Sequence, residues 1–354
     1  MTDKDHSKSF RDYIHLAYEE RKPLQFKAGG SKSFYGRQTE TPIMDVSHHR
    51  GILNYEPTEL ILTARAGTPL TEIEQVLADQ NQMLPFEPPH FGDKATLGGA
   101  IASGLSGPTR PYTGAVRDFV LGVRIINGKG EIIQFGGEVM KNVAGYDVSR
   151  LMTGALGTLG LLLEISIKVL PKPAQAITLS RELDVNEAQQ QMLAYAQQAL
   201  PISAACHDGQ KMFLRLSGAS LAVAAAKKQL GGVELDDSAT FWRSLREQQH
   251  KFFSNSPSLY RLSVPASTPI TTFSGEQFID WGGAQRWLKT DQSLSTLQDK
   301  AASVNGHCTL FRHQNEEYDV FQPLNGTLKQ LHLNLKLAFD PHNILNPTRM
   351  YSDF

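Results

Sequence analysis

The chain has 354 residues, a length that suits about two domains of ordinary size with a cleft between them. Hydrophobic residues make up 40% of it and charged residues 20%, as in a globular protein, and a net charge of −1 gives no basic field that would recruit nucleic acid. The two cysteines, Cys206 and Cys308, are too few for an ordinary iron–sulfur cluster, and neither HExxH nor a paired CxxC indicates zinc.

The first 22 residues are polar and mixed in charge, without the apolar core of a signal peptide. No run of about 18 apolar residues occurs in the chain, and this pattern predicts no membrane-spanning helix. We therefore expect a cytoplasmic protein that is peripheral on the inner face of the cell membrane only through a partner.

The first half of the chain is rich in glycine and in short predicted strands. Buried strands are predicted over residues 43–46 and 60–64, and an alternating strand over 159–169. Thr68 is the predicted cap of a helix with Pro69 at its first position and an apolar stripe behind it. Two further strands flank a strong turn signal and predict a hairpin, with the turn at Asn127-Gly128-Lys129-Gly130.

The glycine cluster extends from Gly29 to Gly160 and stops before the proline-rich step at residues 170–173. We place a domain boundary there, which gives a first domain of residues 1–172 and a second of 173–354. In the second, helices are predicted over 186–200, 221–230, 241–253, 294–304 and 324–339, and strands over 202–206, 211–216, 259–264 and 277–281. This mixture indicates an antiparallel sheet with helices on one face.

Four glycine-rich segments are the candidate binding site. In residues 27–33, consecutive small residues let backbone N–H groups turn toward one anion, although a surface turn is the other interpretation. In residues 95–104, small residues permit close approach to a flat ligand, or simply begin a tightly packed helix. The third segment is 107–118, and the fourth comprises 140–147 and 154–160. Its GxxGxxG spacing, with a strand after it, excludes a Rossmann fingerprint.

Taken in this order, the segments resemble the FAD domain of the vanillyl-alcohol-oxidase class of flavoproteins. The stretches that carry the resemblance are residues 29–33, 95–104, 116–122 and 154–160. The resemblance implies an α+β fold. A two-subdomain FAD-binding domain of the p-cresol-methylhydroxylase (PCMH) type would be followed by an α+β cap domain with an antiparallel sheet.

The same resemblance implies which residues bind FAD. The first segment would hold the pyrophosphate through the amides of Gly29, Gly30, Ser31, Lys32 and Ser33. The second would line the isoalloxazine and the pyrophosphate through Thr96, Gly98, Gly99 and Ser103. The pocket would be completed by Asp118 and by a glycine-rich turn of Gly157, Thr158, Leu159 and Gly160. Some relatives attach FAD covalently through a histidine after the first glycine pair. Ser31 occupies that position here, so we expect non-covalent FAD.

Three further stretches, residues 139–147, 306–312 and 339–347, resemble the FAD-binding E subunits of glycolate oxidase. They extend the resemblance to nearly the whole chain. It implies an FAD-dependent oxidoreductase that acts on the CH–OH group of 2-hydroxy acids within a complex. That complex oxidises glycolate to glyoxylate and contains a second flavin subunit and an iron–sulfur subunit. We expect the FAD of this subunit to serve in electron transfer.

One departure from the catalytic relatives is evident. Those that oxidise 2-hydroxy acids carry an HxGDGNxH motif, and the nearest fragment here, His207-Asp208-Gly209, is typical of a hairpin turn. We therefore assign no catalytic residue and no metal ligand. His307 and His313 either face the flavin or are structural, and Arg312 is a candidate for binding a carboxylate. Two alternatives stay open: a stand-alone FAD-dependent D-2-hydroxy-acid dehydrogenase, and a non-catalytic scaffold subunit of the complex.

Overall fold

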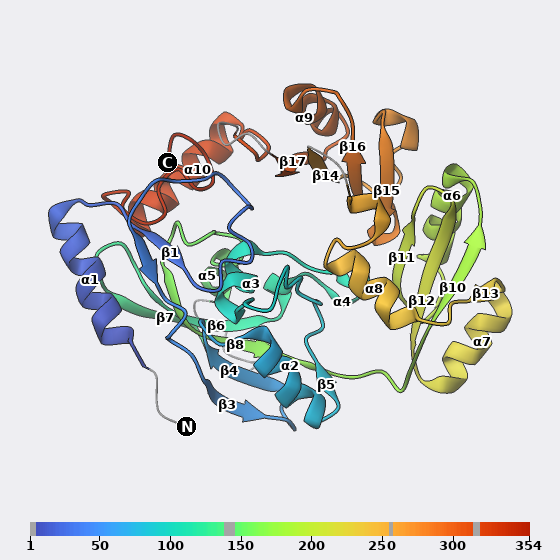
Figure 1. Ribbon diagram of the computed structural model, residues 1–354, viewed down its shortest axis with the longest axis horizontal. Coiled ribbons are helices and arrows are strands. Elements are labelled where there is room, and N and C mark those ends of the chain that lie inside the picture. Colours follow the sequence, from blue (N-terminus) through green and yellow to red (C-terminus); the bar gives the residue numbers. More distant parts are fainter. Residues whose placement is uncertain (1–4, 138–145, 255–257, 314–318) are drawn as a thin grey trace.

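The computed structural model describes residues 5–137, 146–254, 258–313 and 319–354. Two α+β halves lie side by side in it (Figure 1). The predicted α+β fold with antiparallel sheets is confirmed. Most of the stretch 139–147, which contributed to the resemblance, lies outside the described residues.

A five-stranded antiparallel sheet forms the centre of the first half, in the order β3-β4-β8-β6-β7. Helices α2 and α3 bury apolar side chains such as Ile73 and Ile101 against it. A short parallel pair, β1 and β2, lies outside this sheet with α1. The bounds in this half are α1 (Ser7–Glu20), β1 (Gln25–Lys27), β2 (Ile43–Asp45), β3 (Ile52–Glu56), β4 (Ile61–Arg65), α2 (Leu70–Asp79), β5 (Gln82–Met83), α3 (Leu97–Ser103), α4 (Arg110–Thr113), β6 (Val120–Ile126), β7 (Ile132–Gly136), α5 (Tyr146–Leu151), β8 (Leu161–Lys168) and β9 (Leu170–Pro171).

Two local predictions in this half have different outcomes. The hairpin between β6 and β7 is confirmed, and the side-chain oxygen of Asn127 accepts hydrogen bonds from the amides of Lys129 and Glu131. The prediction that Thr68 caps α2 is wrong, because its hydroxyl instead exchanges hydrogen bonds with the backbone of Gly51. Helix α2 begins one residue later than expected, after Pro69.

The second half contains an eight-stranded antiparallel sheet in the order β13-β10-β12-β11-β15-β16-β14-β17. The turn at residues 207–209 joins β11 to β12, as the sequence predicted. The bounds are β10 (Gln175–Glu182), α6 (Val185–Tyr195), β11 (Ile202–His207), β12 (Lys211–Gly218), α7 (Ser220–Leu230), β13 (Val233–Glu234), α8 (Ser238–Arg246), β14 (Leu259–Ser263), β15 (Glu276–Asp280), β16 (Gln285–Lys289), α9 (Leu294–Ser303), β17 (His307–Arg312) and α10 (Gly326–Phe339).

The helices of the second half cover both faces of its sheet, which corrects the expectation of a single covered face. Helices α6 and α7 pack with Ala205 and Leu214 on one face, whereas Trp242 of α8 packs with Cys206 and Phe213 on the other. Alternate residues of a strand point to opposite faces, so α8 lies across the sheet from α6 and α7. Helix α8 also ends at Arg246, short of the predicted 253, and Gln248 follows with a positive φ of 53°.

The face that carries α8 is also the face that meets the first half. Tyr35 and Leu105 of the first half share an apolar cluster with Phe278, Trp287 and Phe311 of the second. The ring of Tyr35 lies 5.3 Å from that of Phe311, and aromatic pairs at this spacing contribute beyond their buried area. This aromatic seam fixes the two halves against each other.

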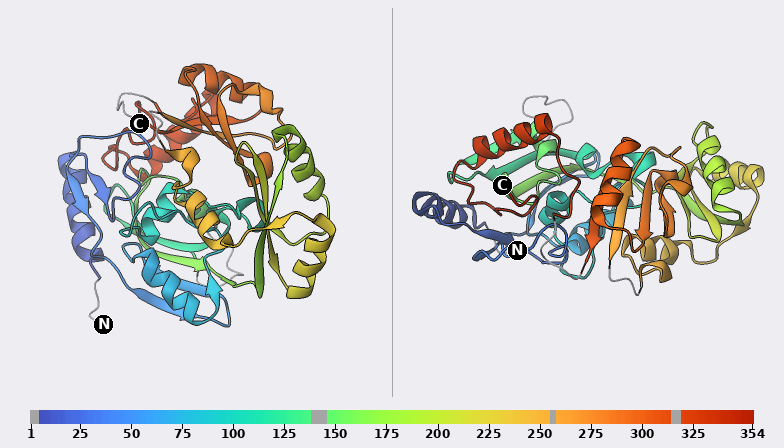
Figure 2. Two further views of the ribbon diagram at one scale, coloured as in Figure 1. Left: turned by 45° about the vertical axis from the view of Figure 1, so that its right-hand side comes forward. Right: turned by 90° about the horizontal axis from the view of Figure 1, so that it is seen from above.

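The C-terminal segment returns to the first half after β17. Helix α10 lies over that half (Figure 2), and Leu345 forms a parallel bridge with Leu24. Ile344 and Leu345 are buried in one cluster with Ile14 of α1. The first sheet is complete by β8 and the second begins with β10, so we propose a division between residues 172 and 173 with a terminal segment that packs back on the first half.

Candidate functional site

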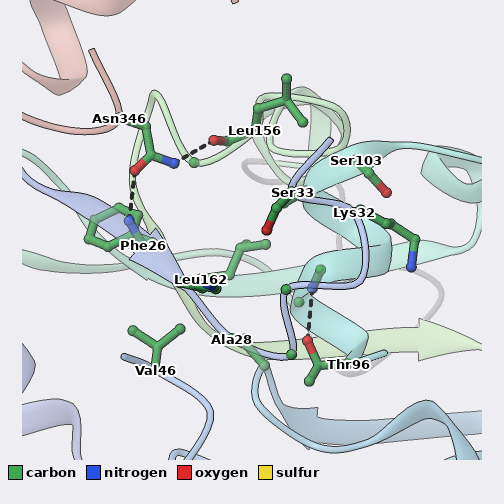
Figure 3. Close-up of a pocket in the computed structure, with 18 of the residues that line it drawn as sticks. Phe26, Ala28, Lys32, Ser33, Val46, Thr96, Ser103, Leu156, Leu162 and Asn346 are labelled. Atoms are coloured by element: carbon green, nitrogen blue, oxygen red, sulfur yellow. Dashed lines mark hydrogen bonds between the residues drawn. The ribbon is translucent and has the colours of Figure 1, made fainter. Parts of the chain in front are cut away.

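A pocket lies in the first half, where the glycine-rich segments meet (Figure 3). Its walls are the loop after β1, the N-terminal end of α3, the turn before β8 and two residues of the C-terminal segment. The space between the walls is about 920 Å³, part of it open to solvent.

The loop at residues 29–33 presents free backbone donors. The amides of Gly29, Gly30, Ser31 and Lys32 make no hydrogen bond to any described part of the chain. A turn closes the loop, because the amide of Ser33 donates to the carbonyl of Gly30 at 3.1 Å. Successive free amides in such a turn form a concavity that suits an anion.

Two glycines of this loop are required by its geometry. A Cβ on Gly29 would lie 1.4 Å from the carbonyl oxygen of Lys94, a distance that no side chain permits. Gly30 has a φ of +68°, in the left-handed region that glycine adopts without strain. The path of the loop therefore excludes a side chain at Gly29, and a side chain at Gly30 would strain the backbone.

The N-terminal end of α3 forms a second wall. The hydroxyl oxygen of Thr96 caps the helix by accepting a hydrogen bond from the amide of Gly99 at 3.2 Å. A Cβ on Gly98 would lie 2.7 Å from the Cβ of Ala66, so the small residue lets the helix approach β4 closely. A Cβ on Gly99 would meet only the Thr96 hydroxyl. The two interpretations of residues 95–104 are therefore compatible, because the start of α3 is tightly packed on one side and lines the pocket on the other.

The charge of the pocket is positive. Among the described residues, four cationic side chains and no carboxylate line it: Lys27, Lys32, Lys94 and Arg349. The ammonium of Lys32 is largely buried, and its nearest described partners are neutral oxygens, the hydroxyl of Ser31 at 3.4 Å and the carbonyl of His90 at 3.3 Å. Burial lowers the pKa of Lys32 to about 8. A buried ammonium without an ion pair favours an anionic ligand.

The C-terminal segment supplies two residues that the sequence did not assign to the pocket. The side chain of Asn346 bridges two walls, because it accepts from the amide of Phe26 and donates to the carbonyl of Leu156 (Figure 3). The guanidinium of Arg349 donates to the carbonyls of Ser33 and Tyr35, and its burial lowers its pKa to about 10. Arg349 thus holds the loop, and Asn346 holds the adjoining strand β1, each from more than 300 positions away in sequence.

Most of the predicted cofactor residues meet in this pocket. Eleven of the fourteen line it: Gly29, Gly30, Ser31, Lys32, Ser33, Thr96, Gly98, Gly99, Ser103, Gly157 and Gly160. The other three lie outside its lining. Thr158 is buried and donates to the carbonyl of Ala155, Leu159 belongs to the core, and Asp118 accepts from Arg150 and from the amide of Ala115. Their contribution to binding remains a prediction.

The candidate polar residues of the second half lie apart from this pocket. Arg312 stacks 4.0 Å above the ring of Phe34 and donates to the side chain of Gln248. His307 lines a different cavity, between the two halves. Within the described residues, no group of three or more potential ligands is arranged to hold a metal ion. No described helix has both the length and the apolar character needed to cross a membrane.

Comparisons with known proteins agree with this geometry. A family model described as "FAD binding domain" matches residues 5–136. Glycolate oxidase subunit GlcE of Escherichia coli (strain K12) is 47% identical over 349 residues, which are 99% of this chain and 98% of that protein. Glycolate oxidase subunit GlcD of Bacillus subtilis (strain 168) is 23% identical and covers 86% of this chain and 78% of its own length. D-lactate dehydrogenase of Anaerostipes hadrus is 33% identical over 36% of this chain and 26% of that protein.

The fold also has solved counterparts. Alkyldihydroxyacetonephosphate synthase superimposes with a TM-score of 0.68 over 97% of this chain and 75% of that one, at 14% sequence identity. At this identity the likeness concerns the fold. It agrees with the fold class that the resemblance implied.

Proposed function

Because the chain belongs to the family of glycolate oxidase E subunits, we propose that it is the FAD-binding subunit of a complex that oxidises glycolate to glyoxylate. The observation that carries this proposal is the pocket in which eleven predicted residues meet around an excess of positive charge. A dinucleotide diphosphate is an anion of the kind that such a pocket favours.

The residues present fit FAD. The free amides of residues 29–32 and the buried ammonium of Lys32 would hold the diphosphate. Gly98 and Gly99 would let a flat group approach the start of α3. Ser31 offers no imidazole for covalent attachment, which supports non-covalent binding. Bound FAD would supply the two-electron acceptor that oxidation of a 2-hydroxy acid requires.

We infer that electrons leave this chain through partner subunits. The only cysteines, Cys206 and Cys308, are both buried, and burial raises the pKa of each thiol. They therefore stay as unreactive thiols and offer no second redox group to pass electrons on. The similarity to a GlcD subunit supports a complex in which a second flavin subunit takes part, and an iron–sulfur subunit would carry electrons onward. Attachment to a membrane would then depend on a partner.

An absorption spectrum of the purified full chain tests the proposal. We expect a flavin spectrum, and we expect acid precipitation to release all of the colour into the supernatant because FAD is not covalently bound. A colourless protein that also takes up no FAD from solution would contradict the proposed function. Colour that stays with the precipitated protein would contradict non-covalent attachment alone.

A further inference from the structure

A second cavity lies where the two halves meet. It spans about 1110 Å³, part of it open to solvent, and its lining comes from both halves. Ser103 at the end of α3 lines this cavity and also the cofactor pocket, so the two spaces adjoin there. A small molecule in the second cavity would therefore lie next to the pocket that we assign to FAD.

Three arginines and one histidine line this cavity, and no carboxylate does so among the described residues. Arg110 begins α4, and Arg117 follows it in a short 3-10 helix. Arg261 lies on β14 and His307 on the neighbouring strand β17. None of the three arginines forms an ion pair within the described parts of the chain.

The sheet register explains why Arg261 and His307 share the cavity. Arg261 pairs directly with Thr309 across β14 and β17, and both line the cavity. His307 lies two residues from Thr309, so its side chain points to the same face of the sheet. The first half contributes Arg110 and Arg117 from the opposite wall.

Aromatic contacts orient two of the guanidinium groups. Arg110 lies 4.4 Å from the ring centroid of Trp281, whose indole N–H is itself fixed on the carbonyl of Gly107. Arg261 lies 5.9 Å from the ring of Tyr35. The ring contact of Arg110 leaves N–H groups at the edge of its guanidinium for an anion, and the guanidinium of Arg261 also donates to the hydroxyl of Tyr35 at 3.5 Å.

One carboxylate, that of Asp118, acts on Arg110 and favours its charged form, but other donors engage it. The carboxylate of Asp118 accepts from Arg150 at 2.5 Å and from the amide of Ala115 at 2.9 Å. The positive groups of the cavity consequently act on one another. Burial, followed by the charges of Arg261 and Arg117, lowers the pKa of Arg110. The side chain of His307 is partly exposed. Its pKa is nevertheless lowered, first by desolvation and then by the charges of Arg261 and Arg110.

We propose that this cavity is a carboxylate-binding site of the chain itself, and that it receives the 2-hydroxy acid beside the cofactor pocket. The proposal rests on the proposed function, which it deepens by naming Arg110, Arg117, Arg261 and His307 as the residues that face the acid. No carboxylate lines the cavity among the described residues, so these like charges repel one another there, and a bound carboxylate would relieve that repulsion. Arginine also matches a carboxylate with two parallel N–H donors. The FAD of this subunit would then meet the acid directly.

The test uses the FAD-loaded full chain and oxalate, a dicarboxylate that has no C–H bond to be oxidised. We expect oxalate to change the visible flavin spectrum in a saturable way, and we expect oxalate to slow the reduction of the flavin by glycolate without oxygen. Arg117→Gln and Arg261→Gln should each raise the Kd for oxalate by roughly tenfold or more, because each removes a charge-assisted hydrogen bond. Arg261→Lys keeps the positive charge but loses the two parallel N–H donors, so its Kd for oxalate should lie between those of the wild type and Arg261→Gln.

Arg312→Gln is the matched control, because Arg312 also lies at the seam between the halves but lines neither cavity. Its oxalate affinity should equal that of the wild type at equal FAD content. The inference would be overturned if oxalate left the flavin spectrum unchanged, or if the Arg→Gln variants had the wild-type Kd for oxalate. Either result would leave the FAD-subunit proposal intact. Inorganic phosphate that binds as tightly as oxalate would also overturn it, since the cavity would then hold any anion.

A second readout does not depend on flavin. Trp281 is stacked on Arg110, so its fluorescence should respond to oxalate even in protein without FAD. The response should disappear in Trp281→Phe. If FAD fails to bind but this response persists, the carboxylate site stands and the proposed cofactor role fails.

Discussion

Lys336 and Asp340 form a buried ion pair at 2.7 Å, one helical turn apart at the end of α10. The ammonium of Lys336 also donates to the carbonyls of Thr158 and Leu345, and the carboxylate of Asp340 accepts from the amides of Ile344 and Leu345. This cluster joins the C-terminal segment to the glycine-rich turn before β8. It therefore supports the cofactor pocket without lining it.

Removal of Asp340 should destabilise the protein strongly. In Asp340→Ala the ammonium of Lys336 would stay buried without its counter-ion, and such losses lower the free energy of unfolding by about 3–5 kcal/mol. Urea denaturation followed by circular dichroism measures the change. Lys329→Ala, which removes the exposed ion pair with Asp353, is the matched control and should change it by less than about 1 kcal/mol. Equal effects of the two substitutions would argue against the buried cluster.

Lys32 should contribute to FAD affinity through its charge. Lys32→Met is expected to weaken FAD binding by about tenfold to a hundredfold, since a charge-assisted contact to the diphosphate would be lost. Titration of FAD-free protein, followed by flavin fluorescence, gives the Kd. Lys22→Met removes an exposed lysine outside the pocket and should leave that Kd unchanged. An unchanged Kd in Lys32→Met would exclude Lys32 from the diphosphate site.

The same residue predicts how FAD affinity depends on pH. Lys32 has a pKa of about 8 before ligand binds, and a nearby diphosphate raises it because the anion favours the charged form. Affinity should be constant well below pH 8 and should fall above it, by up to about tenfold per pH unit, because binding then requires uptake of a proton. In Lys32→Arg the side chain stays charged, so the same titrations should give a flat profile. A flat profile in the wild type would contradict the assignment.

The loop after β1 should not tolerate a side chain at Gly29. In Gly29→Ala the new Cβ would lie 1.4 Å from the carbonyl oxygen of Lys94, so the loop must shift and its free amides must move with it. We expect purified Gly29→Ala to contain much less FAD per chain than the wild type. Gly326→Ala is the control, because a Cβ there meets nothing within 4 Å. Full FAD content in Gly29→Ala would show that the loop geometry is not needed for binding.

Local sequence patterns predicted much of the fold and of the pocket. The glycine-rich segments could be located from composition, but Gly29, Gly30 and Thr96 were assigned to a cofactor site only through the resemblance to the FAD domain, because glycine itself permits many backbone conformations. The hairpin at Asn127 followed from its turn residues. Thr68 could not be placed correctly, because a capping residue can also bond to a distant loop, and here it bonds to Gly51.

The remaining pocket residues depend on contacts far apart in sequence. Asn346 and Arg349 resemble ordinary polar residues in their local context, and only the return of the C-terminal segment brings them to the loop. Arg110, Arg117 and Arg261 are likewise unremarkable singly. They form a cavity only because β14 faces the first half across the aromatic seam.

The position of Asn346 and Arg349 also sets an order of events during synthesis. Every other wall of the cofactor pocket is encoded before the second half of the chain, but these two residues follow it. The pocket therefore lacks its closing residues until translation has passed residue 349, by which point the whole second sheet has been synthesised. A nascent first half that folds early would hold FAD less firmly than the finished protein, so cofactor retention reports on completion of the chain.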